Sequence, residues 1–161
     1  MRASIRTNNR IGLAFVAMVM CLSASPALQG PPASKLIAAK SLRCTFALNS
    51  SGTWQKNGKP ESAAKPANLA LQFEGIDIDE GTARLRTGSM DSDLVARWVP
   101  GYLHFIQSFR SGPLYTTTVF DKEASPGKFK AVHSRHEYFT VPIAGATSTP
   151  EQYYGECEVT K

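Results

Sequence analysis

The sequence predicts an all-β fold: a single small antiparallel up-and-down barrel, or strongly curled sheet, of about eight strands. Apolar residues alternate with polar ones along most of the chain after residue 41. Turn signals containing Gly or Pro separate these stretches, with no amphipathic helix of useful length between them. Cys44 and Cys157 fall on the apolar faces of the first and last predicted strands, so a disulfide between them would close the sheet.

The cysteine count supports that closure. Cys21 lies in a segment that is expected to be removed, which leaves Cys44 and Cys157 to pair in an oxidising compartment. Chain-entropy models assign roughly 4–5 kcal/mol to closing a loop of more than a hundred residues. A β-sandwich of the immunoglobulin kind is the alternative fold, but its disulfide encloses a much shorter segment.

The N-terminal residues have the pattern of a secretory signal peptide. Three arginines precede an uninterrupted apolar stretch from Ile11 to Leu22, and Ser25 and Ala27 then provide a plausible cleavage site. A membrane anchor is the alternative, but a bilayer span needs roughly 20 apolar residues, about twice this length. The pattern predicts a signal peptide at residues 1–27, an extended leader at 28–40 and a single β domain at 41–161. Within the leader, Lys35–Lys40 either forms one helical turn or continues the extended chain. We expect a protein exported to the periplasm or the extracellular space, with a bacterial source favoured and no transmembrane anchor after cleavage.

The composition of the mature chain excludes several classes of partner. Signal cleavage removes three arginines and no acidic residue, so the formal net charge falls from +5 to +2. Nucleic-acid and membrane binding need clustered basic residues on the mature surface, so neither partner is expected. The sequence has no phosphate loop, dinucleotide fingerprint or Cys-x-x-Cys motif, and we expect no cofactor. A small apolar ligand or a protein partner remains.

The first half of the domain predicts a strand, a long loop and a hairpin. Alternation from Leu42 to Leu48 indicates a half-buried strand, and the polar segment Asn49–Asn68 is expected to be a mobile or functional loop. The alternation in Leu69–Phe73 changes phase at Glu74-Gly75, which predicts a β-bulge. A tight turn at Glu80-Gly81 then follows. Reading outward from this turn places Ile78 opposite Ala83, Asp77 opposite Arg84 and Ile76 opposite Leu85.

The second half predicts a series of hairpins. Pro100-Gly101 is typical of a type II turn and places Arg97 opposite His104. Later turns and loops are expected at Arg110–Pro113, Asp121–Lys128 and Thr140–Gln152. The strands between and after them are predicted at Tyr115–Phe120, Phe129–Tyr138 and Tyr153–Val159, the first of which is rich in β-branched and aromatic residues.

A short motif in the polar segment supports a barrel. Gly52-Thr53-Trp54 resembles the Gly-x-Trp element near the start of lipocalins, which are ligand-binding barrels of eight strands. The resemblance covers three residues. In that family the element leads into the first strand, whereas here a predicted strand precedes it. The resemblance therefore implies a barrel and carries no ligand with it.

The richest cluster of polar residues lies in the predicted strand near residue 135. A hydrolytic enzyme could use His133, Arg135 and Glu137 there, with His133 as the acid or base and Arg135 as an anion clamp. His133 and His136 point to opposite faces of a strand, so they do not share a metal, and we expect no metal site. His133 and Arg135 do share a face, which a polar group from a neighbouring strand could join.

The function expected from these observations is non-catalytic binding. Trp98, Phe105 and Phe120 are the candidate ligand-binding residues, expected inside the barrel with Leu103. The alternatives are a hydrolytic enzyme that uses the His133–Glu137 stretch and a purely structural envelope protein. A binding protein and an enzyme both require a cavity, and a structural protein does not. The enzyme requires in addition that His133, Arg135 and a carboxylate converge beside the cavity.

Overall fold

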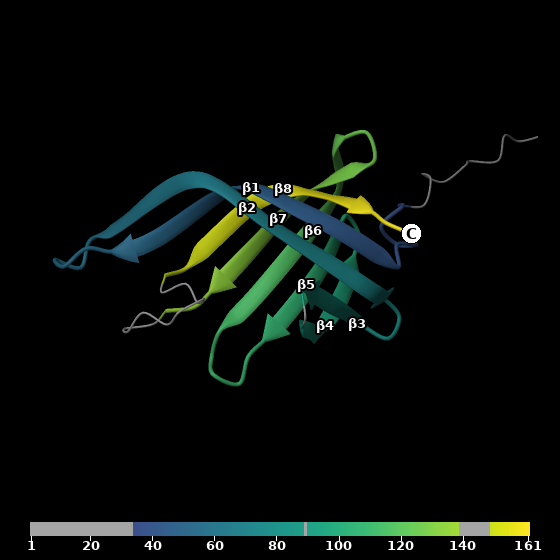
Figure 1. The fold of residues 1–161 in the computed structure, drawn as a ribbon, viewed down its shortest axis with the longest axis horizontal. Coiled ribbons are helices and arrows are strands. Elements are labelled where there is room, and N and C mark those ends of the chain that lie inside the picture. Colours follow the sequence, from purple (N-terminus) through teal and green to yellow (C-terminus); the bar gives the residue numbers. More distant parts are fainter. Residues whose placement is uncertain (1–33, 89, 139–148) are drawn as a thin grey trace, which may run out of the picture. The chain divides into compact units, whose positions relative to one another are not determined.

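Eight antiparallel strands form one closed barrel, which confirms the predicted fold class. The computed structural model describes residues 34–88, 90–138 and 149–161. Each strand is hydrogen-bonded to the next along the chain, and the last strand pairs with the first (Figure 1). The strands are β1 (Ser41–Trp54), β2 (Pro60–Asp77), β3 (Thr82–Thr87), β4 (Met90–Val99), β5 (Tyr102–Ser108), β6 (Leu114–Ser125), β7 (Lys128–His136) and β8 (Glu151–Val159).

The predicted disulfide is confirmed and joins the two strands that close the barrel. Cys44 of β1 and Cys157 of β8 are directly paired residues in the ladder between these strands. Both are buried. The covalent bond therefore reinforces the pairing between the first and last strands of the barrel.

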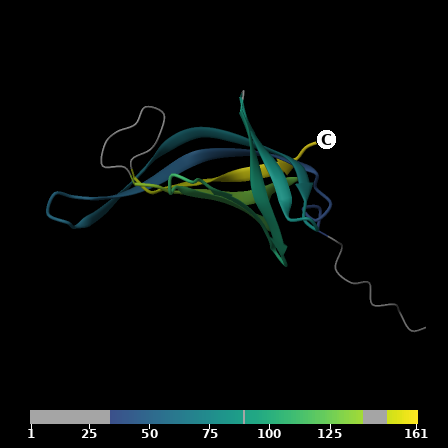
Figure 2. The ribbon, with the colours of Figure 1, turned by 90° about the horizontal axis from the view of Figure 1, so that it is seen from below.

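β1 and β2 form a much longer hairpin than the sequence predicts. The loop expected at Asn49–Asn68 is wrong, because β1 runs on to Trp54 and β2 already begins at Pro60. This part of the hairpin extends beyond the other strands (Figure 2), and the residues of β2 in it are exposed. Polar and apolar residues need not alternate in a strand whose two faces are both in water. The strands still form there, because pairing within the hairpin satisfies their backbone hydrogen-bonding groups.

The β2–β3 hairpin contains the predicted bulge but not the predicted pairing. The register shifts beside Gly75, whose φ of +58° favours glycine. Phe73, not Ile76, lies opposite Leu85. The turn is wider than expected, because the Asp77 carboxylate accepts hydrogen bonds from two backbone N–H groups within it.

The β4–β5 hairpin follows the prediction. Gly101 has a φ of +90°, as the third residue of a type II turn requires. Arg97 lies opposite His104. The Nδ1 atom of His104 is 3.0 Å from the hydroxyl of Thr118 on β6, so this histidine has a structural partner.

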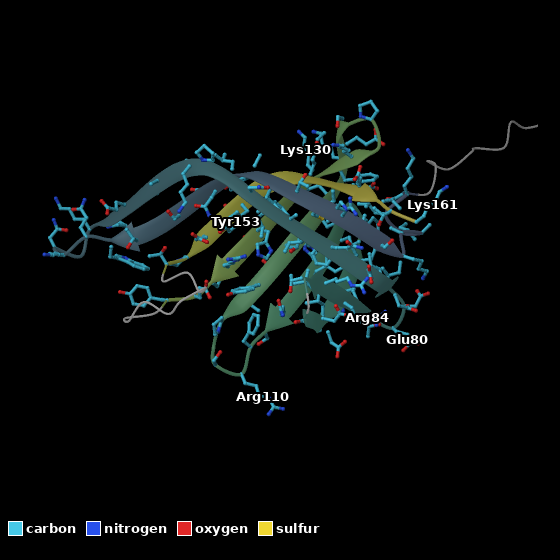
Figure 3. All side chains as sticks on the ribbon, viewed as in Figure 1. Glu80, Arg84, Arg110, Lys130, Tyr153 and Lys161 are labelled. Atoms are coloured by element: carbon cyan, nitrogen blue, oxygen red, sulfur yellow. A yellow bond between two sulfur atoms is a disulfide. The ribbon has the colours of Figure 1, made fainter. Side chains whose placement is uncertain are left out.

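One end of the barrel is closed by the residues that precede β1. This closed end carries the β2–β3, β4–β5 and β6–β7 turns, and the open end carries the β3–β4, β5–β6 and β7–β8 connections. The predicted leader does not stay extended through residues 34–40: it turns back, and Leu36 and Ala39 are buried in the core. In Figure 3, Glu80 and Lys161 lie toward the closed end and Arg110 and Tyr153 toward the open end.

The half of the interior nearer the closed end is filled with side chains. Phe73 and Phe105 stack across it with ring centroids 4.1 Å apart. The other fully buried residues of this core include Leu42, Ile76, Leu103 and Val119. Dense packing of this kind makes the core rigid, and the core forms the inner boundary of the open half of the barrel.

Two predictions fall on parts of the chain that are not described. The signal peptide at residues 1–27 and most of the β7–β8 loop lie outside the described residues. Among those that are described, no helix is long and apolar enough to cross a membrane.

Candidate functional site

The open end of the barrel holds a cavity of about 760 Å³. Its lining residues come from strands β2 to β7 and the β5–β6 turn, so it belongs to the interior of the barrel. The apolar lining residues are Leu71, Leu85 and Phe109, and the polar ones are Thr87, Asp91, Ser92, Gln107, Tyr115, His133 and Arg135. In a small-molecule site the apolar residues bury the surface of the molecule and the polar groups fix its orientation.

The polar side of the cavity is built by alternation along β6, β7 and β8. His133 and Arg135 are two residues apart on β7, so both point into the barrel. His133 is paired with Thr117 of β6 and Tyr153 of β8. Arg135, one step nearer the open end, is paired with Tyr115 and Glu151 in the same way. Antiparallel register therefore assembles one cluster from three strands.

His133 is a buried, neutral imidazole in this cluster. Its Nδ1 atom is 2.8 Å from the Thr117 hydroxyl, and its Nε2 atom accepts a hydrogen bond of 3.3 Å from Nε of Arg135. Burial, assisted by the Arg135 charge, lowers the pKa of His133 from 6.5 to about 4. Because Arg135 can only donate, Nε2 must carry the lone pair and Nδ1 the proton. His133 thus donates to Thr117.

Arg135 is held between two aromatic rings. Its guanidinium carbon lies 5.4 Å from the ring centroid of Tyr115 and 5.2 Å from that of Tyr153. Both distances are within the range of cation–π attraction. No carboxylate of the described residues lies within ion-pair distance of it, and the bond to His133 uses only Nε. The two Nη groups keep their donors available at the cavity.

The two tyrosines that flank Arg135 are tied to carboxylates. Tyr115 donates a hydrogen bond of 2.6 Å to Glu137, and Tyr153 donates one of 2.5 Å to Glu151. Burial, followed by the hydrogen bond to the carboxylate, raises the pKa of each phenol to about 12. Both hydroxyls therefore stay protonated at neutral pH, and the rings are fixed in place on either side of the guanidinium.

Asn49 is an unsatisfied polar residue on the inner face of β1. Its side chain is 1% exposed, and neither its amide nitrogen nor its amide oxygen forms a hydrogen bond of good geometry with the described residues. It pairs with Tyr153 across the β1–β8 ladder, and its contact with that phenol lowers the pKa of Tyr153 less than burial and the bond to Glu151 raise it.

The structure brings two of the sequence-predicted polar residues to the cavity and the third close to it. His133 and Arg135 line the cavity, and Glu137 lies beside it through Tyr115. His136 is exposed on the opposite face. Neither Tyr115 nor Tyr153 was predicted as a site residue. Tyr153 has the same phase on its strand as Cys157, whereas Tyr115 has the opposite phase to Phe120, the residue of its strand that was expected inside. The aromatic partners of a charged residue could be recognised only from the pairing of strands.

The predicted aromatic ligand-binding residues do not form one site. Phe105 lies inside the barrel but is buried under the cavity in its stack with Phe73. Trp98 packs against the core near the closed end. Phe120 does not point inward as expected: it lies on the outer face, edge to face with Tyr102.

The Trp54 of the Gly-x-Trp segment is equally remote from the interior. It is 55% exposed and packs edge to face against Tyr138 near the end of the protruding hairpin. A barrel forms, as the resemblance to lipocalins implied, but this tryptophan does not plug it.

A second hollow, slightly larger at about 780 Å³, lies on the outer surface. It is lined from the β4–β5 turn, β6, β7 and β8, with Tyr102, Phe120 and Tyr154 among its residues. Its charged residues Asp121, Lys122 and Lys130 face solvent. We take the interior cavity as the candidate site, because there the polar groups are partly desolvated and fixed by neighbouring side chains.

The geometry does not favour acid–base catalysis at His133. The lone pair of the imidazole faces a donor of Arg135, and its proton is given to Thr117. Thr117 is therefore not activated as a nucleophile, since activation requires a base that accepts its proton. Among the described residues, no group of three or more His, Cys, Asp or Glu side chains could hold a metal ion. What the arrangement offers is a cation held in a fixed position with hydrogen-bond donors directed at the cavity.

No family model, curated protein or solved structure matches this chain. The candidate site is therefore defined by the geometry of the described residues alone.

Proposed function

We propose that this protein is an exported binding protein that takes a small, largely apolar molecule into the open end of its barrel. The observation that carries this proposal is the cavity of about 760 Å³ with its apolar wall of Leu71, Leu85 and Phe109. Its volume lies in the range of roughly 300–1,000 Å³ that is typical of small-molecule sites.

The rest of the barrel supports a preformed site. The Phe73–Phe105 stack forms a rigid floor, and the buried Leu36 covers the opposite end. The Cys44–Cys157 disulfide ties the closing strand pair. A cavity on such a scaffold needs little reorganisation to accept a ligand, and preorganisation lowers the free-energy cost of binding.

Export is the second part of the proposal. The disulfide supports it, because such bonds persist in oxidising compartments and are rare in the cytosol. We expect the protein purified from its own cells to begin at Leu28, as N-terminal sequencing would measure. A chain that retains residues 1–27 in the cytosol would contradict this part.

The binding proposal is tested with N-phenyl-1-naphthylamine, an uncharged apolar probe that fluoresces when it leaves water. We expect the native protein to bind it. Ser92→Phe should weaken binding at least about tenfold, equivalent to ~1.4 kcal/mol, because a bulky ring at Ser92 fills the cavity from its wall.

The matched control is Phe120→Ala, which alters the outer hollow and leaves the cavity unchanged. It should bind the probe as the native protein does. If Phe120→Ala abolishes binding and Ser92→Phe does not, the ligand site is the outer hollow. If the native protein and Phe120→Ala both fail to bind the probe, the binding proposal fails and a purely structural role gains support.

A further inference from the structure

Among the described residues, Arg135 is a cation without an ion-pair partner, and it lies at the mouth of the cavity. The exposed Arg86 pairs with Glu74, and the half-buried Lys128 pairs with Glu156. Arg135 is half-buried, yet it forms no ion pair within the described residues. A partly desolvated charge costs free energy unless it gains compensating contacts, so an unpaired arginine in this position calls for an explanation.

The surroundings of Arg135 fix its direction and leave its donors unused. The rings of Tyr115 and Tyr153 lie on either side, and the Nε bond to His133 anchors the inner edge of the guanidinium. The outer edge, with the two Nη groups, is left for a partner. An arginine side chain presents paired N–H donors whose spacing matches the two oxygens of a carboxylate or phosphate.

The nearby carboxylates do not take this role. Glu137 and Glu151 accept hydrogen bonds from the tyrosine hydroxyls, which lie at the far ends of the rings. Asp91, on the opposite wall of the cavity, is exposed and lies 3.8 Å from Arg86. None of these carboxylates is within ion-pair distance of the guanidinium of Arg135.

We propose that Arg135 binds the oxyanion head group of the ligand, so that the protein takes amphipathic molecules with a carboxylate or phosphate at one end. The apolar tail then lies against Leu71, Leu85 and Phe109, and the head group lies at Arg135 beside Tyr115 and Tyr153. This inference rests on the proposed function, since it assigns the chemistry of the molecule that enters the same cavity.

The test measures displacement of N-phenyl-1-naphthylamine by matched twelve-carbon ligands below their micelle concentrations. We expect dodecanoate or dodecyl phosphate to bind about tenfold or more tightly than dodecanol, and dodecylamine to bind no better than dodecanol. The tighter of the two anions identifies the head group. Equal binding of all ligands, or preference for the amine, overturns the inference and leaves the proposed function standing. Failure of the probe itself to bind would overturn the proposed function instead.

Two variants assign the preference to this residue. Arg135→Met removes the charge while keeping a long side chain, and should bind the anion and dodecanol equally. Arg135→Lys keeps the charge without the paired donors, and should retain only part of the preference. Circular dichroism and thermal melting show whether each variant folds. A folded Arg135→Met protein that still prefers the anion overturns the inference, and the ligand series on the native protein decides the matter if the variant does not fold.

Discussion

At the scale of single residues, the candidate site depends on which groups are charged. His133 is neutral because it is buried beside Arg135, whereas Tyr115 and Tyr153 keep their protons because they are partly desolvated and bonded to carboxylates. Arg135 is thus the cation that faces the cavity among the residues of this cluster. The sequence indicated that His133 and Arg135 share a face, but the charge of the histidine depends on burial.

The low pKa of His133 predicts a loss of stability in mild acid. Its pKa is about 4 in the folded protein and near 6.5 in the unfolded chain, so protons bind preferentially to the unfolded chain between these values. The contribution of neutral His133 to the free energy of unfolding is complete above pH 6.5. It is lost as the pH falls toward 4, and the total loss is roughly 3 kcal/mol. Urea unfolding at pH 7 and pH 4.5 measures it.

His133→Gln isolates this contribution. Glutamine can still form hydrogen bonds but does not titrate, so the free energy of unfolding of this variant should fall less between pH 7 and pH 4.5. The exposed His136 provides the control, and His136→Gln should retain the pH dependence of the native protein. An unchanged pH dependence in His133→Gln would show that the imidazole is not held neutral by burial.

At the scale of elements, backbone contacts decide where side chains are tolerated. Gly155 of β8 lies opposite Phe46, beside the irregularity in β1. A Cβ atom at this position would lie 2.0 Å from the backbone oxygen of Thr45. Backbone cannot move aside as a flexible side chain can, so the glycine is required by close approach of the two strands.

Gly155→Ala should therefore destabilise the protein by about 1–3 kcal/mol or more, as overpacking against rigid neighbours does. Gly52 provides a matched comparison in the protruding hairpin, where an added Cβ would meet nothing within 4 Å. Gly52→Ala should change the free energy of unfolding by less than about 0.5 kcal/mol. Equal effects of the two substitutions, measured by chemical denaturation, would mean that β1 and β8 are not so close.

The turn before β1 is a second element whose role can be measured. Leu36 is fully buried, whereas its neighbour Ile37 is 40% exposed. Leu36→Ala should lower the free energy of unfolding by about 2–5 kcal/mol, the usual cost of removing a buried leucine, and Ile37→Ala should lower it much less. If both substitutions are neutral by denaturant titration, residues 34–40 are a leader and do not belong to the barrel.

At the scale of the whole molecule, closure depends on the β1–β8 pair. Cys44→Ser should lower the melting temperature markedly, because the disulfide closes a loop with a sequence separation of 113 residues, for which chain-entropy models assign roughly 4–5 kcal/mol. Reductant should destabilise the native protein in the same way and have no further effect on Cys44→Ser. If reductant leaves the native melting temperature unchanged, the bond does not contribute to closure.

The sequence by itself determined the fold class, the disulfide, the Gly75 bulge and the β4–β5 turn, because period-two alternation and turn chemistry are local properties. It also placed His133 and Arg135 on one face. The sequence failed where solvent covers both faces of a strand, as in the first part of β2 from Pro60 to Pro66, since nothing there forces polar and apolar residues to alternate.

Only the tertiary structure decided how strands meet and what is buried. The register between β6, β7 and β8 brought Tyr115 and Tyr153 to either side of Arg135, and the wide β2–β3 turn set Phe73 opposite Leu85. Closure of the barrel determined that Phe105 is buried beneath the cavity while Phe120 lies on the outer surface. Pairing between distant strands and burial are properties of the assembled sheet, and local sequence patterns do not contain them.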